Sequence, residues 1–331
     1  MRLGERMRRR PVAWFFALAM VMEVAVVAVF LGSGAAGVLE AAMEATGLTG
    51  KTDFVSAYRL AVETPQAIPG IALSILQPFT PDIAALVVAA VAFGTVGVKR
   101  LARGFRFWSA DVGWRRGLWV WGLMLLIFFV AMPLAVAGLD ALFMPEGTWE
   151  WSGHPISWSL LPALFVALFL NVGAVSEESG WRGFAQPILQ DRTTPLAASL
   201  IVGLLWGLWH FPARPDILLG GYGMRGGALL LGILVVRFVF LSVVMAYFYN
   251  RAGGSTLIAI AMHGLHNDPV LFSGRIVGDT TESYIISELA LLAPITVTAC
   301  IILILAGRKL GLSKPSGSGT GTVPSPVPSA S

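Results

Sequence analysis

The sequence predicts an all-α membrane protein, a polytopic bundle of about eight transmembrane helices around a cavity within the membrane. First, the 331 residues are 56% hydrophobic and only 13% charged, whereas soluble domains contain about 25% charged residues. Second, apolar stretches recur with roughly the 20 residues that a helix needs to cross a bilayer. Third, the few polar side chains inside the later stretches are grouped into three short clusters.

The expected spans follow one another along the chain, with a long, partly apolar loop between the first two. They lie at residues 12–32, 80–98, 117–138, 160–189, 196–216, 228–249, 254–272 and 285–306. Pro78 and Pro81 can shift the start of the second span. The apolar residues 62–78 of the preceding loop can form a surface or re-entrant helix.

The distribution of Lys and Arg predicts the orientation of the chain. Loops rich in Lys and Arg stay in the cytoplasm, and one side of the predicted bundle collects Arg2, Arg6, Arg8, Arg9, Arg10, Lys99, Arg100, Arg103, Arg106, Arg115, Arg116, Arg308, Lys309 and Lys314. The loop between spans three and four carries acidic residues and neither Lys nor Arg. We therefore expect a multi-pass plasma-membrane protein with both termini cytoplasmic. Basic residues that flank apolar spans also argue against a nucleic-acid partner.

The most informative cluster is Glu177-Glu178-Ser-Gly-Trp-Arg182, which continues a long apolar run. A charge at the bilayer centre costs on the order of 3 kcal/mol, so these groups need a role. Glu178 and Arg182 are four residues apart and share a helix face, which favours an ion pair. Glu177 points about 100° away, free to face the cavity as a general base acting on water.

Two histidine clusters follow, Trp206-Gly-Leu-Trp-His210 and His263-Gly-Leu-His-Asn267. His263 and Asn267 share a helix face and offer hydrogen-bond donors for a developing oxyanion. We expect Trp206 and Trp209 mainly to fill apolar space. If the fourth helix extends to about residue 189, the three clusters reach one depth and can share a cavity open to cytoplasmic water.

These three motifs resemble those of the CPBP group, the CAAX protease and bacteriocin-processing enzymes, also called Abi-type intramembrane glutamate proteases. The family pattern is Glu-Glu-x-x-x-Arg, Phe-x-x-x-His and His-x-x-x-Asn or Asp, and Trp206 replaces the usual Phe. The resemblance covers roughly residues 158–271. It implies an endopeptidase without a cofactor that hydrolyses membrane-associated or lipidated substrates of CAAX or bacteriocin and signal-peptide type.

The resemblance also implies a role for each motif residue. Glu177 and His210 would activate water, His263 and Asn267 would stabilise the oxyanion, and Glu178 and Arg182 would support the site. We accordingly divide the chain into an N-terminal transmembrane region of about three helices (1–150), a catalytic domain (151–306) and a disordered cytoplasmic tail (307–331). The first apolar stretch exceeds the roughly 7–15 residues of a cleavable signal, which favours a retained helix over a cleaved one.

Three alternatives remain open at this point. A zinc metalloprotease could use Glu177, His210 and His263 as ligands, although the sequence lacks His-Glu-x-x-His and has a single cysteine, Cys300. A non-enzymatic immunity or binding protein could retain the same motifs. A transporter usually shows repeated halves, and no repeat is visible. The substrate's identity and the oligomeric state are not encoded in any recognisable motif.

Overall fold

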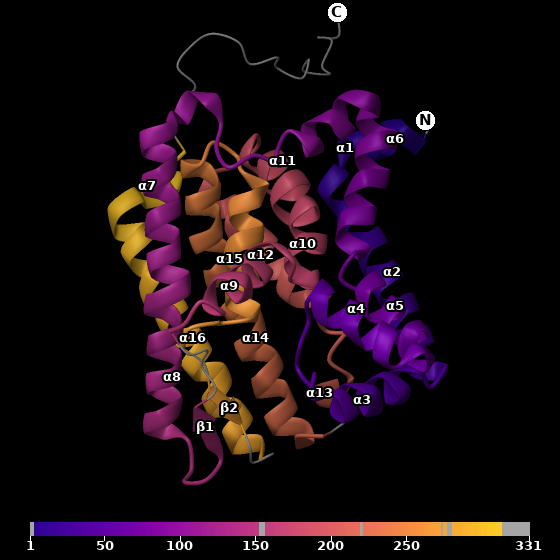
Figure 1. Ribbon diagram of the computed structural model, residues 1–331. Helices are drawn as coiled ribbons and strands as arrows, with labels where there is room; N and C mark the ends of the chain where they lie inside the picture. The colour runs from indigo at the N-terminus through magenta and orange to yellow at the C-terminus, as the bar shows by residue number, and fades with distance from the viewer. Residues whose placement is uncertain (1–2, 152–155, 219–220, 273, 277–279, 313–331) are drawn as a thin grey trace, which may run out of the picture.

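The computed structural model of the protein describes residues 3–151, 156–218, 221–272, 274–276 and 280–312. Over these residues the chain is predominantly helical (Figure 1). Two short antiparallel strands, β1 (Trp149–Trp151) and β2 (Gly274–Ile276), join two distant loops. The structure confirms the predicted all-α polytopic bundle.

Five helices in the described part of the chain are long and apolar enough to cross a membrane. They are α2 (Pro11–Gly32), α6 (Thr80–Ala102), the continuous run of α7 (Trp114–Leu125), η3 (Leu126–Ala131) and α8 (Met132–Phe143), α14 (Gly223–Arg251), and α16 (Thr281–Ala306). They match five of the expected spans. Inside this bundle Arg237 of α14 pairs with Glu288 of α16 at 3.3 Å, which gives the intramembrane guanidinium a partner.

The other three expected spans are shorter or interrupted, which corrects the prediction of eight full-length helices. α12 (Pro195–Trp209) and α15 (Thr256–Asn267) end early, and the predicted 160–189 helix is divided. Its parts are α9 (Leu160–Phe169), α10 (Val172–Glu178), the π-helical η4 (Ser179–Ala185) and α11 (Gln186–Gln190). The motif residues therefore lie at helix ends and in a π-helical turn.

Asn171 occupies the break between α9 and α10, and residues of a distant loop satisfy the backbone there. Asn171 Oδ1 accepts the N–H of Ala174 at 3.1 Å and caps α10. Val172 donates its backbone N–H to the carbonyl of Thr52 at 2.8 Å. Non-helical backbone at membrane depth persists only where protein or water satisfies it. The interruption thus depends on Thr52, which no pattern within 160–189 could reveal.

The loop between α2 and α6 folds into three helices, α3 (Ala35–Thr46), α4 (Phe54–Glu63) and α5 (Ile68–Leu76). The expected helix near 62–78 is therefore present. Leu39, Leu60 and Ile71 are among the side chains that pack these helices together. With α13 (Pro215–Leu218) they lie towards the lower end of the molecule in Figure 1. We call α3–α5 and their connections the α3–α5 insertion.

The upper end in Figure 1 holds both ends of the described chain. α1 (Leu3–Arg9) packs beside the last turns of α6, and η5 (Gly307–Lys309) follows α16. The described Lys and Arg side chains of the α1, α6–α7 and η5 segments therefore lie together at this end. Part of the expected disordered tail (307–331) is ordered, because Leu310 is buried and its carbonyl accepts from Asn250 Nδ2 at 3.1 Å. Residues 313–331 lie outside the described residues.

One hydrophobic core joins the first half of the chain to the second. Phe15 of α2 packs edge-on against Trp181 of η4, with ring centroids 5.0 Å apart. Val88 of α6 and Trp206 of α12 belong to the same buried cluster. The predicted domain boundary at residue 150 stays a prediction, but the residues on its two sides pack together and position η4.

Candidate active site

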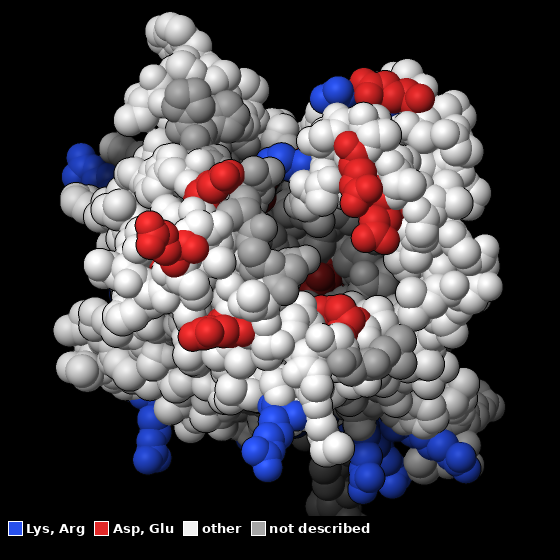
Figure 2. All heavy atoms as spheres, turned by 90° about the horizontal axis from the view of Figure 1, so that it is seen from below, with Lys and Arg blue, Asp and Glu red and all other residues white. Residues whose placement is uncertain are grey.

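Glu177, His210 and Asn267, one from each motif, line a single cavity of about 490 Å³. They are contributed by α10, the turn after α12 and the last residue of α15. Figure 2, seen from below, shows a hollow on the face where the α3–α5 insertion lies. That insertion supplies part of the wall, including Leu39, Met43, Lys51, Thr52, Asp53, Ser56 and Ile75. The sequence carried no motif in this region, so its contribution was missed.

Trp206 holds two of these groups at once. Its indole N–H donates to Glu177 Oε2 at 2.7 Å, and its backbone carbonyl lies 2.8 Å from His210 Nδ1. A carbonyl oxygen can only accept, so Nδ1 carries a proton, and in the neutral ring the Nε2 lone pair is free. The expectation that Trp206 is apolar filling is wrong, because the indole N–H orients the carboxylate. His210 also stacks on Phe238, with centroids 4.2 Å apart.

Glu178 faces away from the cavity into a buried polar cluster. Arg182 Nη1 lies 3.5 Å from Glu178 Oε2, which confirms the expected pairing. Glu178 Oε1 lies closer, 2.9 Å, to His263 Nδ1. The Arg182 guanidinium lies 4.4 Å from the centre of the Trp206 ring. All three polar side chains of this cluster are buried, so the charges depend on one another for stabilisation.

His263 therefore lies behind the cavity rather than among the residues that line it. Its ring meets Trp206 edge-on at 5.0 Å between centroids. Because Nδ1 faces Glu178, an interaction of His263 with an oxyanion would have to use Nε2. The oxyanion role expected for His263 stays a prediction.

Asn267 is held by Asn171, a residue that the sequence analysis did not single out. Asn267 Nδ2 donates to Asn171 Oδ1 at 3.2 Å, and Asn171 Nδ2 donates to Thr52 Oγ1 at 3.1 Å. The chain of amides connects the α3–α5 insertion to the third motif through the break before α10. An amide nitrogen carries two hydrogens, so Asn267 retains a second donor.

Two residues at the start of α6 hold the polypeptide around the first two motifs. Asp82 Oδ1 accepts the backbone N–H of Gly180 at 2.7 Å, and this satisfies a donor in the π-helical turn. Thr80 Oγ1 lies 3.2 Å from Trp209 Nε1 and, at the same distance, from Glu23 Oε2. These contacts come from residues before 150, where sequence spacing gives no signal of proximity.

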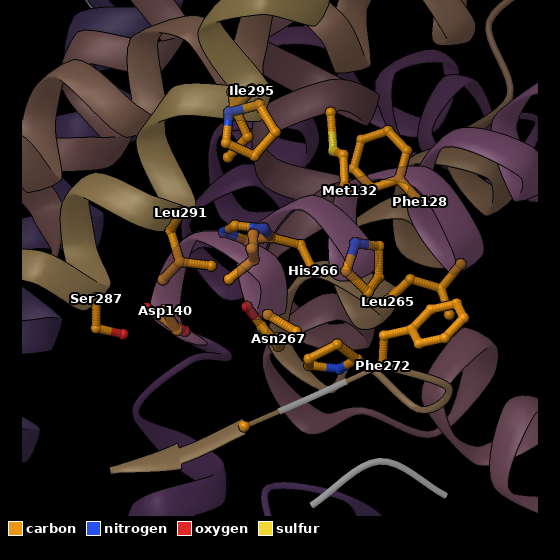
Figure 3. A pocket seen from close by; sticks show the side chains of 16 residues that line it. Phe128, Met132, Asp140, Leu265, His266, Asn267, Phe272, Ser287, Leu291 and Ile295 are labelled. Atoms are coloured by element: carbon orange, nitrogen blue, oxygen red, sulfur yellow. The ribbon is translucent and has the colours of Figure 1, made fainter. Parts of the chain in front are cut away.

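A second, smaller cavity of about 210 Å³ borders Asn267 (Figure 3). Its polar lining includes Asp140, His266 and Ser287, while Phe128 and Leu291 are among its apolar walls. Figure 3 shows these side chains converging from η3, α8, α15 and α16. His266 thus lines this cavity and not the one that holds Glu177.

The proposed zinc ligands do not form a compact ligand set. Among the described residues, no three His, Cys, Asp or Glu side chains are placed to hold a metal ion. Glu177 Oε2 is engaged by Trp206, and His263 Nδ1 faces Glu178. The side chains as arranged do not fit a zinc site made of Glu177, His210 and His263, and we derive no step through a metal.

The fold and the site define a polytopic membrane protein in which a buried Glu177, a half-buried His210 and an exposed Asn267 line one cavity. In the comparison with known proteins, residues 158–267 match the family described as type II CAAX prenyl endopeptidase Rce1-like. All three motifs lie within that segment, and the resemblance to the CPBP group is confirmed there.

A curated relative supports the same assignment. The chain is 36% identical over 91 residues to the CAAX prenyl protease 2 of Methanococcus maripaludis. The aligned region is 26% of this chain and 32% of the relative. Because the chain matches about a third of the relative's length, the comparison supports the family of the motif-bearing segment.

Proposed function

We propose that this protein is an intramembrane endopeptidase that hydrolyses peptide bonds of membrane-associated protein or peptide substrates by glutamate-activated water. The observation that carries the proposal is the double role of Trp206. Its indole orients Glu177, and its carbonyl fixes the tautomer of His210. Both of these side chains line one cavity together with Asn267. A family match over residues 158–267 supports the reaction class.

In the proposed reaction, a water molecule in the cavity donates hydrogen bonds to Glu177 and to the free Nε2 of His210, and Glu177 takes one proton from it. The water oxygen attacks the carbonyl carbon of the scissile peptide. The second N–H of Asn267 stabilises the resulting oxyanion, because its first is engaged by Asn171. Collapse of the tetrahedral intermediate breaks the C–N bond, and the proton passes to the leaving amine.

The remaining groups support this arrangement. Glu178, Arg182 and His263 form a buried cluster behind Trp206. We assign Glu178 and Arg182 to stabilising the site. The catalytic groups belong to the segment 151–306, and the α3–α5 insertion forms part of the cavity wall. We further propose that the protein lies in the plasma membrane with both termini cytoplasmic, on the basis of the Lys and Arg distribution.

The test is hydrolysis of a fluorogenic membrane-anchored peptide by purified full-length protein. Glu177→Gln should abolish cleavage, and Glu40→Gln, an exposed Glu on the insertion, is the matched control that should cleave normally. Near-normal turnover by Glu177→Gln would overturn the glutamate mechanism. Wild-type activity that is lost on chelation and restored by zinc would favour a metalloprotease. A wild-type protein that binds the peptide without cleaving it would favour the non-enzymatic binding protein.

A further inference from the structure

Two of the residues that line the catalytic cavity, His210 and Asn267, lie at the ends of helices that start at the basic end of the molecule. Asp191, just before α12, pairs with Arg100 at 3.2 Å, and Thr256, the first residue of α15, donates its N–H to the carbonyl of Gly104. Both helices therefore begin beside the α6–α7 connection. α12 has 15 residues, a length of roughly 22 Å at 1.5 Å per residue. His210 follows its last turn, and Asn267 ends α15.

The cavity reaches solvent at the opposite end, where the α3–α5 insertion lies. Its lining includes the exposed Gly50 and Lys51 and the half-buried Arg214. Figure 2, the view from that end, shows the hollow directly, with acidic side chains around it. The ends of the described chain lie at the other end of the bundle (Figure 1).

The two ends differ sharply in unpaired positive charge. The end that carries the chain termini includes the exposed side chains of Arg9, Lys99, Arg103, Arg116 and Arg308. At the cavity end, the basic residues are mostly matched by acidic neighbours: Lys51 with Asp268 at 3.7 Å, Arg59 with Glu63 at 2.7 Å, and Arg214 with Asp216 at 2.8 Å. Arg225, at the start of α14, also lies there.

We infer that the catalytic cavity opens to the extracytoplasmic side of the membrane, and that its substrate is a peptide segment exposed at the outer surface. Lys and Arg beside spans are retained in the cytoplasm, which assigns the terminus-bearing end to the inside. The cavity mouth then faces outside, whereas the sequence analysis expected a cavity open to cytoplasmic water. The substrate part of the inference rests on the proposed function, whereas the orientation does not.

A cavity that opens to the outside limits the classes of substrate that can reach it. A CAAX-type C terminus that stays in the cytoplasm would be on the wrong side of the bilayer for Glu177 and His210. An exported peptide, or a membrane-spanning one with its cleavable segment at the outer boundary, can enter a mouth formed by the α3–α5 insertion. Among the proposed substrates, the geometry therefore favours exported or signal-type peptides over cytoplasmic lipidated proteins.

The orientation is tested by thiol labelling of the full chain in intact bacterial cells. Cys300, the single native cysteine, is exposed and is first replaced by serine. Glu44→Cys on α3 reports the cavity end, and Arg103→Cys after α6 reports the terminus-bearing end; both positions are exposed. A membrane-impermeant maleimide should label Glu44→Cys in intact cells and Arg103→Cys only after lysis. The reverse pattern would overturn the inference.

A second measurement tests the substrate side. Two single-span reporter proteins carry the same cleavable segment, one at the outer boundary of the membrane and one at the inner boundary. The wild type should cleave the outer reporter and leave the inner one intact, and Glu177→Gln should cleave neither. Cleavage of the inner reporter alone would overturn the substrate assignment. A purified enzyme without hydrolytic activity would refute the proposed function and leave the labelling result standing, so the two failures are distinguishable.

Discussion

Trp206 donates its indole N–H to Glu177 Oε2 at 2.7 Å, and the backbone carbonyl of the same residue accepts from His210 Nδ1. One residue thus orients both groups that are proposed to activate water. The Arg182 guanidinium lies against the face of the same ring, 4.4 Å from its centre. The Trp that departs from the usual Phe of the motif therefore adds a hydrogen bond that Phe cannot make.

The first prediction concerns this hydrogen bond. Trp206→Phe keeps an aromatic ring but leaves Glu177 Oε2 without its donor. Hydrogen bonds to charged groups contribute about 1.5–3 kcal/mol, so kcat should fall roughly ten- to hundredfold. Trp209→Phe is the matched control on the same helix, because its indole donates to Thr80 and not to Glu177. Equal kcat losses in the two variants would show that the bond to Glu177 has no special effect.

The second prediction concerns the buried charges behind the site. Arg182→Ala leaves Glu178 in an apolar interior with His263 as its remaining partner, and loss of one member of a buried pair costs about 3–5 kcal/mol. Both activity and the melting temperature in detergent should fall, and Arg182→Lys should retain part of each. The double variant Glu178→Gln/Arg182→Gln should lose less melting temperature than the sum of the losses in the two single variants. An Arg182→Ala protein of normal stability without turnover would indicate a direct catalytic role.

The motif residues could be predicted from the sequence because their spacing is local. Residues four apart on a helix share a face, and Glu178 and Arg182 do form a pair. Rules based on α-helical spacing gave no indication of the π-helical η4 or of the break at Asn171. Both features depend on partners from distant segments, namely Asp82 for Gly180 and Thr52 for Val172.

The wall of the cavity was equally inaccessible to sequence reasoning. Lys51, Thr52 and Ser56 are ordinary loop and helix residues, and they gain significance only when the α3–α5 insertion packs against the third motif. Apolar periodicity correctly located the long spans. It did not distinguish a full crossing helix from the shorter α12 and α15, because the expected spans were extended to bilayer length through the Pro-containing, partly charged segments that follow His210 and Asn267.

The third prediction concerns Asn171 as a positioning residue for Asn267. Asn171→Ala removes the acceptor for Asn267 Nδ2 and the cap of α10. We expect a kcat loss of about tenfold, in line with one misaligned donor whose full removal costs about 10²–10³. Thr52→Val, which removes only the outer contact of the amide chain, is the control and should have a smaller effect. An unchanged kcat with an unchanged KM in Asn171→Ala would exclude the positioning role.

The fourth prediction concerns Gly173, which lies between the proposed base and the proposed oxyanion donor. A Cβ at this position would lie 3.2 Å from Glu177 Oε1 and 3.4 Å from Asn267 Nδ2. Gly173→Ala should therefore lower kcat by pushing these two side chains apart, with little change in melting temperature because flexible side-chain ends can yield.

Gly264 provides the contrast for this prediction, because a Cβ there would collide with the backbone carbonyl oxygen of Ala167. Backbone cannot yield in the way that a side-chain end can, so Gly264→Ala should separate α9 from α15 and lower the melting temperature strongly. Turnover and thermal unfolding of both purified variants, measured side by side, decide the matter. A Gly173→Ala enzyme with wild-type kcat would mean that Glu177 and Asn267 do not act on the same peptide bond.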